Sequence, residues 1–171
     1  MATTTTDIAL LILRLVLGLT MAAHGFNKFF GGGGISGTAA WFESIGMKYG
    51  RFQAVTAATA EVAAGLGIAV GLLTPIAAAG FVALMTVAMW TVHRANGFFV
   101  TSNGWEYNLV LATAAVAIAM IGPGYLSLDH QIFCHCWQNG WPGLWISVGL
   151  GIAGAVGQLV LFYRRPVASA A

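Results

Sequence analysis

Five long apolar segments dominate the pattern of hydrophobic and polar positions along this chain. They run over about 8–30, 52–73, 76–95, 106–121 and 144–163, and short polar or glycine- and proline-rich stretches separate them. A helix that crosses a bilayer needs roughly 20 mostly apolar residues. None of the segments alternates at every second position, as a half-buried strand does. The pattern therefore predicts an all-α membrane protein with five transmembrane helices.

The stretches between the segments contain residues that end helices. Proline cannot continue a helix and biases the residue before it away from helical geometry. The breaks are a glycine-rich, aromatic connector over 31–49, Thr74-Pro75, a polar loop over 96–105, Gly122-Pro123-Gly124, and Pro142-Gly143.

The composition agrees with a lipid environment. Hydrophobic residues make up 58% of the chain and charged residues only 7%, whereas soluble domains carry about 25% charged residues. The formal net charge of +2 is small, and the basic residues form no patch. We therefore expect the lipid bilayer as the main partner and exclude nucleic acid.

The distribution of basic residues predicts the orientation. With five spans, six of the seven Lys and Arg residues fall on one face of the membrane. Basic loops stay in the cytoplasm. We therefore expect a multi-pass protein of a bacterial inner membrane, with its N-terminus outside and its C-terminus in the cytoplasm. The six residues are Lys28, Lys48, Arg51, Arg94, Arg164 and Arg165.

Polar residues inside the predicted spans are the strongest candidates for function, because buried charges in a membrane are costly. A helix rise of about 1.5 Å per residue places five of them, from the four leading helices, in the half of the membrane next to the basic face. This arrangement predicts a ligand or proton pocket inside the bundle. The five are His24, Lys28, Glu61, His93 and Asn108.

Glu61 is the central residue of this predicted pocket. Its carboxylate needs a partner, and His24, Lys28 and Arg14 are the candidates, with Arg14 reaching inward from the other half of the membrane. Two interpretations stay open. The group either forms an ion pair that only fixes the helix register, or it serves a proton or a quinone headgroup.

A loop before the last apolar segment holds His130, Cys134, His135 and Cys136. The order Cys-His-Cys is neither a haem-attachment motif nor the usual zinc spacing. Ordinary loop cysteines, a redox-active thiol pair and a metal site all remain as interpretations.

The last apolar segment carries small residues at four-residue spacing on two faces. Such faces let helices pack closely in lipid. They indicate either packing within the chain or an interface with a second copy or a partner subunit. One face has Gly149, Ala153 and Gly157, and the other has Ser147, Gly151 and Ala155.

Several short motifs, in order and at matching spacing, resemble the DoxX family of small membrane proteins. They are Arg14-Leu15, the segment HGFNKFF at 24–30, AEVAAG at 60–65, LLTP at 72–75, Asn108-Leu109 and GPGYLSLD at 122–129. The resemblance implies a four-helix transmembrane bundle over 1–129. A Cys/His loop over 130–143, and an additional fifth helix with a basic tail over 144–171, then lie outside this core.

The family includes the small subunit of a thiosulfate:quinone oxidoreductase and members linked to redox complexes. The resemblance therefore implies an integral membrane subunit of a quinone-associated redox complex, with membrane or periplasmic protein partners and no bound redox centre of its own. A structural or assembly subunit that docks to a larger complex is the alternative, and a small transporter is a third. Quinone and lipid are both open as ligands, and no residue is assigned a catalytic role.

Overall fold

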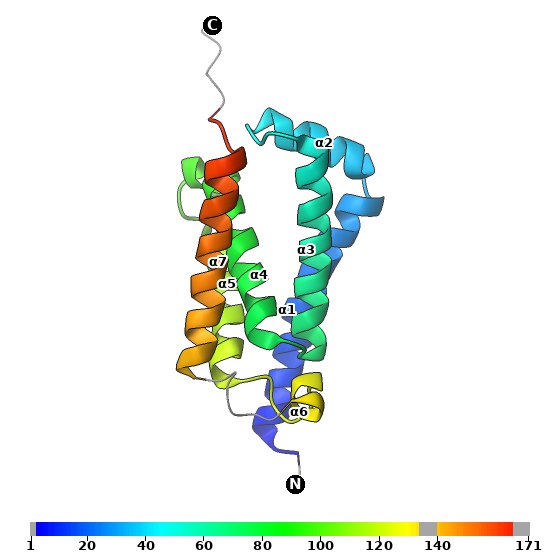
Figure 1. The fold of residues 1–171 in the computed structure, drawn as a ribbon, viewed down its shortest axis with the longest axis vertical. Coiled ribbons are helices and arrows are strands. Elements are labelled where there is room, and N and C mark those ends of the chain that lie inside the picture. The colour runs from blue at the N-terminus through cyan, green and yellow to red at the C-terminus, as the bar shows by residue number, and fades with distance from the viewer. Residues whose placement is uncertain (1–2, 134–139, 166–171) are drawn as a thin grey trace, which may run out of the picture.

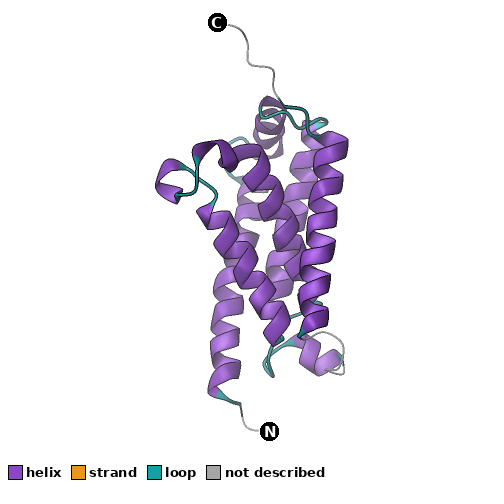
Figure 2. Cartoon of the chain, turned by 90° about the vertical axis from the view of Figure 1, so that its left-hand side faces the viewer, coloured by secondary structure: helices purple, strands orange, loops and turns teal. Residues whose placement is uncertain are grey.

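The structure is a computed structural model that describes residues 3–133 and 140–165. Within these ranges the structure contains helices and no strand (Figure 2). One isolated antiparallel bridge joins Met47 to Tyr163. The predicted all-α fold is confirmed. The α-helices are α1 (Thr5–Phe30), α2 (Gly34–Ser44), α3 (Gly50–Val70), α4 (Thr74–Ala88), α5 (Glu106–Ile121), α6 (Leu128–Ile132) and α7 (Trp141–Phe162).

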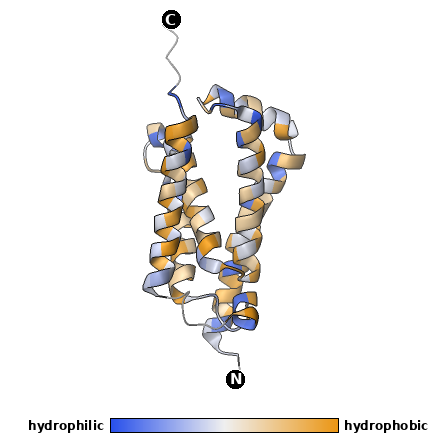
Figure 3. Ribbon diagram, viewed as in Figure 1, coloured by the Kyte–Doolittle hydropathy of each residue, from blue (hydrophilic) through white to orange (hydrophobic). Residues whose placement is uncertain are grey.

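The long helices run in alternating directions along one bundle (Figure 1). Helix α1 packs along α3, while α4 packs against both α5 and α7. Helix α1 begins at one end of the bundle and α7 finishes at the other (Figure 1). We call the end where α1 stops and α3 starts the basic end, and the end that holds Asp7 and Asp129 the aspartate end. Figure 3 shows the apolar residues spread along the helices between these ends.

Four helices are long and apolar enough to cross a membrane. They are Thr5–Phe30, Gly50–Val70, Thr74–Asn96 and Trp141–Phe162, where the third joins α4 to a π-helical turn (Met89–His93) and a 3₁₀ turn (Arg94–Asn96). Helix α5 is apolar but has only 16 residues. The sequence predicted four core spans plus an extra C-terminal one. By length, the extra helix α7 qualifies and α5 does not.

Helix α2 was not predicted, because its segment was assigned to a glycine-rich connector. Gly33 and Gly34 adopt left-handed backbone angles, with φ of 94° and 56°, which glycine reaches without steric cost. The helix then continues to Ser44 and lies across the basic end of the bundle (Figure 1). Its Trp41 and Phe42 reach the wall of a cavity inside the bundle.

Close contact between α1 and α3 depends on glycine. A Cβ atom at Gly25 would lie 2.6 Å from the Ala58 carbonyl oxygen, and one at Gly65 would lie 2.5 Å from the Ala22 amide nitrogen. Small residues of this kind let membrane helices pack at short range. The two helices are therefore held together tightly enough for a side chain on one to bond a side chain on the other.

Helix α7 uses one of its two small-residue faces inside the chain. Ser147, Gly151 and Ala155 are buried, and a Cβ atom at Gly151 would lie 2.5 Å from Val82 Cβ of α4. The second face points away from the bundle, because added Cβ atoms at Gly149 and Gly157 would meet nothing within 4 Å.

Arg14 forms its hydrogen bonds at the aspartate end, so the prediction that it pairs with Glu61 is wrong. Its guanidinium is fully buried and donates to the carbonyl oxygens of Pro123, at 2.7 Å, and Leu126. The arginine lies about four turns from Lys28 on the same helix and meets the α5–α6 connection there. It therefore joins α1 to a segment more than 100 positions away in the sequence.

Asp129 completes this end of the bundle. Its carboxylate accepts from the backbone amides of Leu73, at 2.7 Å, and Thr74, at 2.9 Å, and from the Thr74 hydroxyl at 2.7 Å. These amides begin α4 and have no partner within the helix, so the aspartate caps it from a distant part of the chain.

Candidate functional site

An ion pair between Lys28 and Glu61 forms the centre of the candidate site. Lys28 lies in the last turn of α1, and Glu61 lies midway along α3. The Lys28 ammonium is 2.7 Å from each carboxylate oxygen of Glu61. The two side chains are 20% and 9% exposed, so the pair is largely enclosed but reachable. The close packing of α1 on α3 is what brings them together.

The first of two adjoining cavities, which we call the α5-side cavity, has the ion pair in its wall. It encloses about 600 Å³ of space between atoms, including its open mouth. The structure brings all five residues of the sequence-predicted pocket to this cavity: His24, Lys28, Glu61, His93 and Asn108. Met21, Met85, Leu111 and Trp41 supply apolar and aromatic wall between them.

The three polar residues around the ion pair differ in how much they are already bonded. Asn108 is buried, and its amide lies 3.6 Å from the Met85 sulfur. His93 Nδ1 is 2.8 Å from the Asn103 carbonyl oxygen. His24 lies one turn before Lys28 on α1 and is exposed on that helix. The cavity therefore offers imidazole and amide groups beside a fixed cation and anion.

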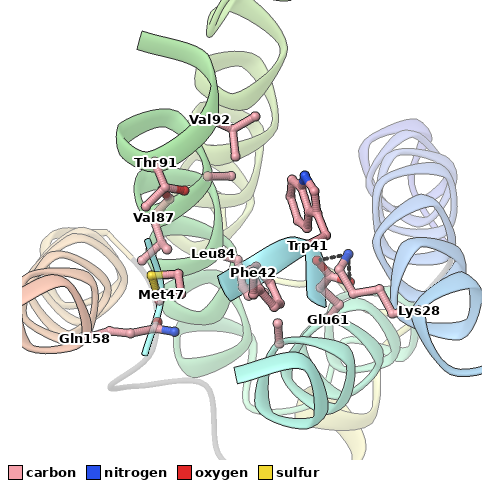
Figure 4. Close-up of a pocket in the computed structure, with 12 residues that line it drawn as sticks. Lys28, Trp41, Phe42, Met47, Glu61, Leu84, Val87, Thr91, Val92 and Gln158 are labelled. Carbon is pink, nitrogen blue, oxygen red and sulfur yellow. Dashed lines mark hydrogen bonds and ion pairs between the residues drawn. The ribbon is translucent and has the colours of Figure 1, made fainter. Parts of the chain in front are cut away.

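The second cavity, the α7-side cavity, shares Lys28, Trp41 and Glu61 with the first. It encloses about 510 Å³, again including its mouth. Figure 4 shows Lys28 and Glu61 on one side of this cavity and Gln158 on the other, with Phe42, Leu84 and Met47 between them.

Gln53 and Gln158 are site residues that the sequence reasoning missed. Gln158 Nε2 on α7 donates to Gln53 Oε1 on α3 at 2.8 Å. The predicted pocket included the Asn108 amide beside ionisable residues, but neither of these two glutamines. The signal was present, because polar amides in membrane helices commonly bond across helices.

The predicted redox or metal loop lies largely outside the described residues. Cys134, His135 and Cys136 fall in the gap after 133. His130 is described, and its ring centroid lies 4.4 Å from that of Tyr125 at the aspartate end. Among the residues of the two described ranges, no group of three or more His, Cys, Asp and Glu side chains could hold a metal ion.

Apolar spans around a cavity that holds an ion pair define a helical membrane protein with a candidate site near one end of its bundle. The DoxX family model matches residues 9–94. A Bacillus subtilis (strain 168) protein named "Putative oxidoreductase CatD" is 30% identical over 127 residues, which is 74% of this chain and 89% of that protein. The chain belongs to the DoxX family. No solved structure matches it.

Proposed function

We propose that this chain is the membrane subunit of a quinone-linked redox complex, and that the quinone headgroup binds in the chamber formed by the α5-side and α7-side cavities together. The observation that carries the proposal is the Lys28–Glu61 pair in the wall of both cavities. A buried pair that serves only helix register would have no need of open space beside it. The name of the Bacillus subtilis relative, an oxidoreductase, supports redox chemistry of the complex.

The pair suits both forms of a quinone. A quinone presents carbonyl oxygens, which accept from the Lys28 ammonium. A quinol presents hydroxyl groups, which donate to the Glu61 carboxylate. Reduction of the quinone takes up two electrons and two protons, and a partner redox protein supplies the electrons. His24, His93 and Asn108 surround the pair and provide hydrogen bonds and proton transfer at the headgroup.

Binding measurements on the full-length protein in phospholipid nanodiscs test this proposal. Quenching of tryptophan fluorescence by an alkylated naphthoquinone includes the signal of Trp41, which lines both cavities and is one of six tryptophans in the chain. A charge-assisted hydrogen bond contributes about 1.5–3 kcal/mol, so Lys28→Met should weaken binding about tenfold or more. Arg51→Met, a matched change of an exposed cation on α3, should leave it unaltered. Equal affinity of Lys28→Met and wild type would refute the proposal.

Turnover adds a second readout. In membranes that contain the partner complex, Glu61→Gln and His24→Ala should lower quinone-linked activity. Normal activity in both variants, with a folded protein, would show that the chamber takes no part in the reaction.

We further propose that the chain crosses a bacterial inner membrane five times, with its N-terminus outside and its C-terminus in the cytoplasm. The alternating path of the long helices supports five passes, because α1 begins at one end and α7 finishes at the other (Figure 1). The 16 residues of α5 span about 24 Å at 1.5 Å per residue. The six basic residues outside the aspartate end support the orientation.

Cysteine labelling of intact cells tests this topology. In a background with Cys134→Ser and Cys136→Ser, Gln131→Cys should react with a membrane-impermeant thiol reagent from outside. Gly32→Cys, where an added Cβ meets nothing within 4 Å, should react only after permeabilisation. Labelling of both positions from the same side would overturn five passes.

A structural subunit is the second candidate, and the outward face of α7 favours it. Only 17% of the apolar window of α7 is buried, and Gly149 and Gly157 leave room for another helix, from a partner subunit or a second copy. Under this proposal a multi-subunit complex should co-purify with the chain and keep full activity in Glu61→Gln. Loss of activity in an intact complex would favour the quinone site instead.

A further inference from the structure

The α7-side cavity is polar at two opposite sides and apolar between them. Lys28 and Glu61 occupy one side, and Gln158 occupies the other (Figure 4). Thr91 also lines the cavity, but its hydroxyl already donates to the Val87 carbonyl oxygen of its own helix at 2.8 Å. The remaining lining residues are aliphatic, aromatic or methionine. A ligand that fits this lining has a flat or apolar middle and polar atoms at both ends.

The Gln158 amide keeps hydrogen-bonding capacity for such a ligand. A glutamine amide has two N–H donors and an oxygen with two lone pairs. Its bond to Gln53 uses one donor, which leaves a second donor and the oxygen. The Gln158 side chain is half-buried, so its amide remains reachable from the cavity for a polar atom of a ligand.

Gln53 lies behind Gln158 and is only 1% exposed. Its Nε2 has no hydrogen-bond partner in the structure, and a buried unsatisfied amide is costly. If both amides turn by half a rotation, the same bond forms with donor and acceptor exchanged. The pair can then direct a different set of Gln158 groups into the cavity. Such a pair can form a hydrogen bond with either a carbonyl oxygen or a hydroxyl group of a ligand.

Resting on the proposed function, we infer that Gln158 binds the second oxygen of a 1,4-dioxygenated ring whose first oxygen meets the Lys28–Glu61 pair. Each side of the cavity then offers both a donor and an acceptor. That match fits a ligand whose two oxygens change together between carbonyl and hydroxyl, as those of a quinone and its quinol do. Gln53 is a positioning residue that holds the Gln158 amide.

The placement of Gln158 makes α7 the source of specificity. The family model matches residues 9–94, which include Lys28 and Glu61 but not Gln158. The matched segment thus supplies one anchoring point, and the added helix supplies the other. A chain with the same first anchor and a different last helix would select a different ring.

A pair of ligands tests the inference without any substitution. The probes are 2-decyl-1,4-naphthoquinone and 2-decyl-1-tetralone, which keeps the fused rings and the chain but has one carbonyl oxygen. Binding of the quinone to the full-length protein in nanodiscs is measured by fluorescence quenching. Binding of the tetralone is measured by its displacement of the bound quinone. One hydrogen bond changes affinity by about three- to tenfold. We expect the quinone to bind more tightly by that factor, and equal affinities would overturn the inference.

Gln158→Met then assigns the difference to one side chain. This near-isosteric change should weaken quinone binding about three- to tenfold and leave tetralone binding unchanged. Val160→Met, on the lipid-facing side of the same helix, should change neither. In the Gln158→Met background, Gln53→Met should have no further effect on quinone affinity, because it acts through Gln158.

The outcomes separate the inference from the proposed function. If quinone binding depends on Lys28 but not on Gln158, the second anchor is refuted and the quinone site stands. If the wild-type protein binds no quinone, the proposed function fails and this inference fails with it. A quinone-specific loss in Gln158→Met supports both.

Discussion

Removal of the Arg14 side chain should cost more stability than any other single change of a charged residue in the bundle. The guanidinium is fully buried and donates to the carbonyl oxygens of Pro123 and Leu126. A hydrogen bond from a charged donor contributes about 1.5–3 kcal/mol, so two such bonds give about 3–6 kcal/mol. Arg14→Met removes both bonds and leaves the carbonyl group of the buried Pro123 without this donor.

Arg14→Lys provides the intermediate case. An ammonium group is a compact donor and lacks the fork that reaches two carbonyl oxygens at once. We expect it to keep one bond and so to lose about half as much stability as Arg14→Met. Arg94→Met is the matched control at the basic end, where the guanidinium lies 4.0 Å from the Trp90 ring centroid. An exposed contact of this type contributes about 0.5–1 kcal/mol.

Unfolding in mixed micelles measures these differences. Dodecyl sulfate is titrated into the protein in a mild detergent, and helix content is followed by circular dichroism. The order of stability should be wild type, Arg94→Met, Arg14→Lys, Arg14→Met. An Arg14→Met variant within about 1 kcal/mol of wild type would refute the assignment of both hydrogen bonds to this end of the bundle.

Three further predictions concern other contacts. Lys28→Met leaves the Glu61 charge without its partner and should lower the free energy of unfolding by about 3 kcal/mol. The double variant Lys28→Met/Glu61→Gln should recover most of this loss, and additive losses in the same titration would contradict the prediction. Gly25→Val places atoms 2.6 Å from a carbonyl oxygen of α3 and should cost about 1–3 kcal/mol, while Gly149→Val, which meets nothing within 4 Å, should cost nothing measurable. Asp129→Ala removes the cap of α4 and should lower the melting temperature in detergent through a loss of about 1–2 kcal/mol; an unchanged melting temperature would show that other groups satisfy these amides.

The sequence was informative about helix positions because each apolar run is long enough to determine an element by itself. The runs over 8–30 and 106–121 correspond to α1 (Thr5–Phe30) and α5 (Glu106–Ile121). Helix α2 was not predicted, because the glycines at 31–34 and 37 lower the helix propensity of this segment. Its aromatic residues Trp41 and Phe42 contact the cavity, which the local sequence does not reveal. Propensity is a weak guide where tertiary contacts decide the outcome.

Depth along a helix could also be predicted, whereas partners far away in the chain could not. Counting residues placed Lys28 and Glu61 in the same half of the bundle, and the structure joins them at 2.7 Å. The same counting could not predict the hydrogen bond from Arg14 to Pro123, because the two residues are 109 positions apart. Gln158 is a similar case, because its contact with Gln53 spans 105 positions. Such pairs depend on how the helices are arranged and not on any local pattern.

The attachment of α7 has a consequence for how the protein is made. Its last turn is tied to the connection before α3, since the Lys48 amide donates to the Phe162 carbonyl oxygen at 2.8 Å and the Arg164 amide to that of Gly46 at 2.8 Å. This helix is synthesised after the other described helices, so one wall of the α7-side cavity stays missing until the ribosome has passed residue 158. Quality-control proteases would meet an incomplete site during that interval, and a nonsense mutation between residues 129 and 158 would leave the site permanently incomplete.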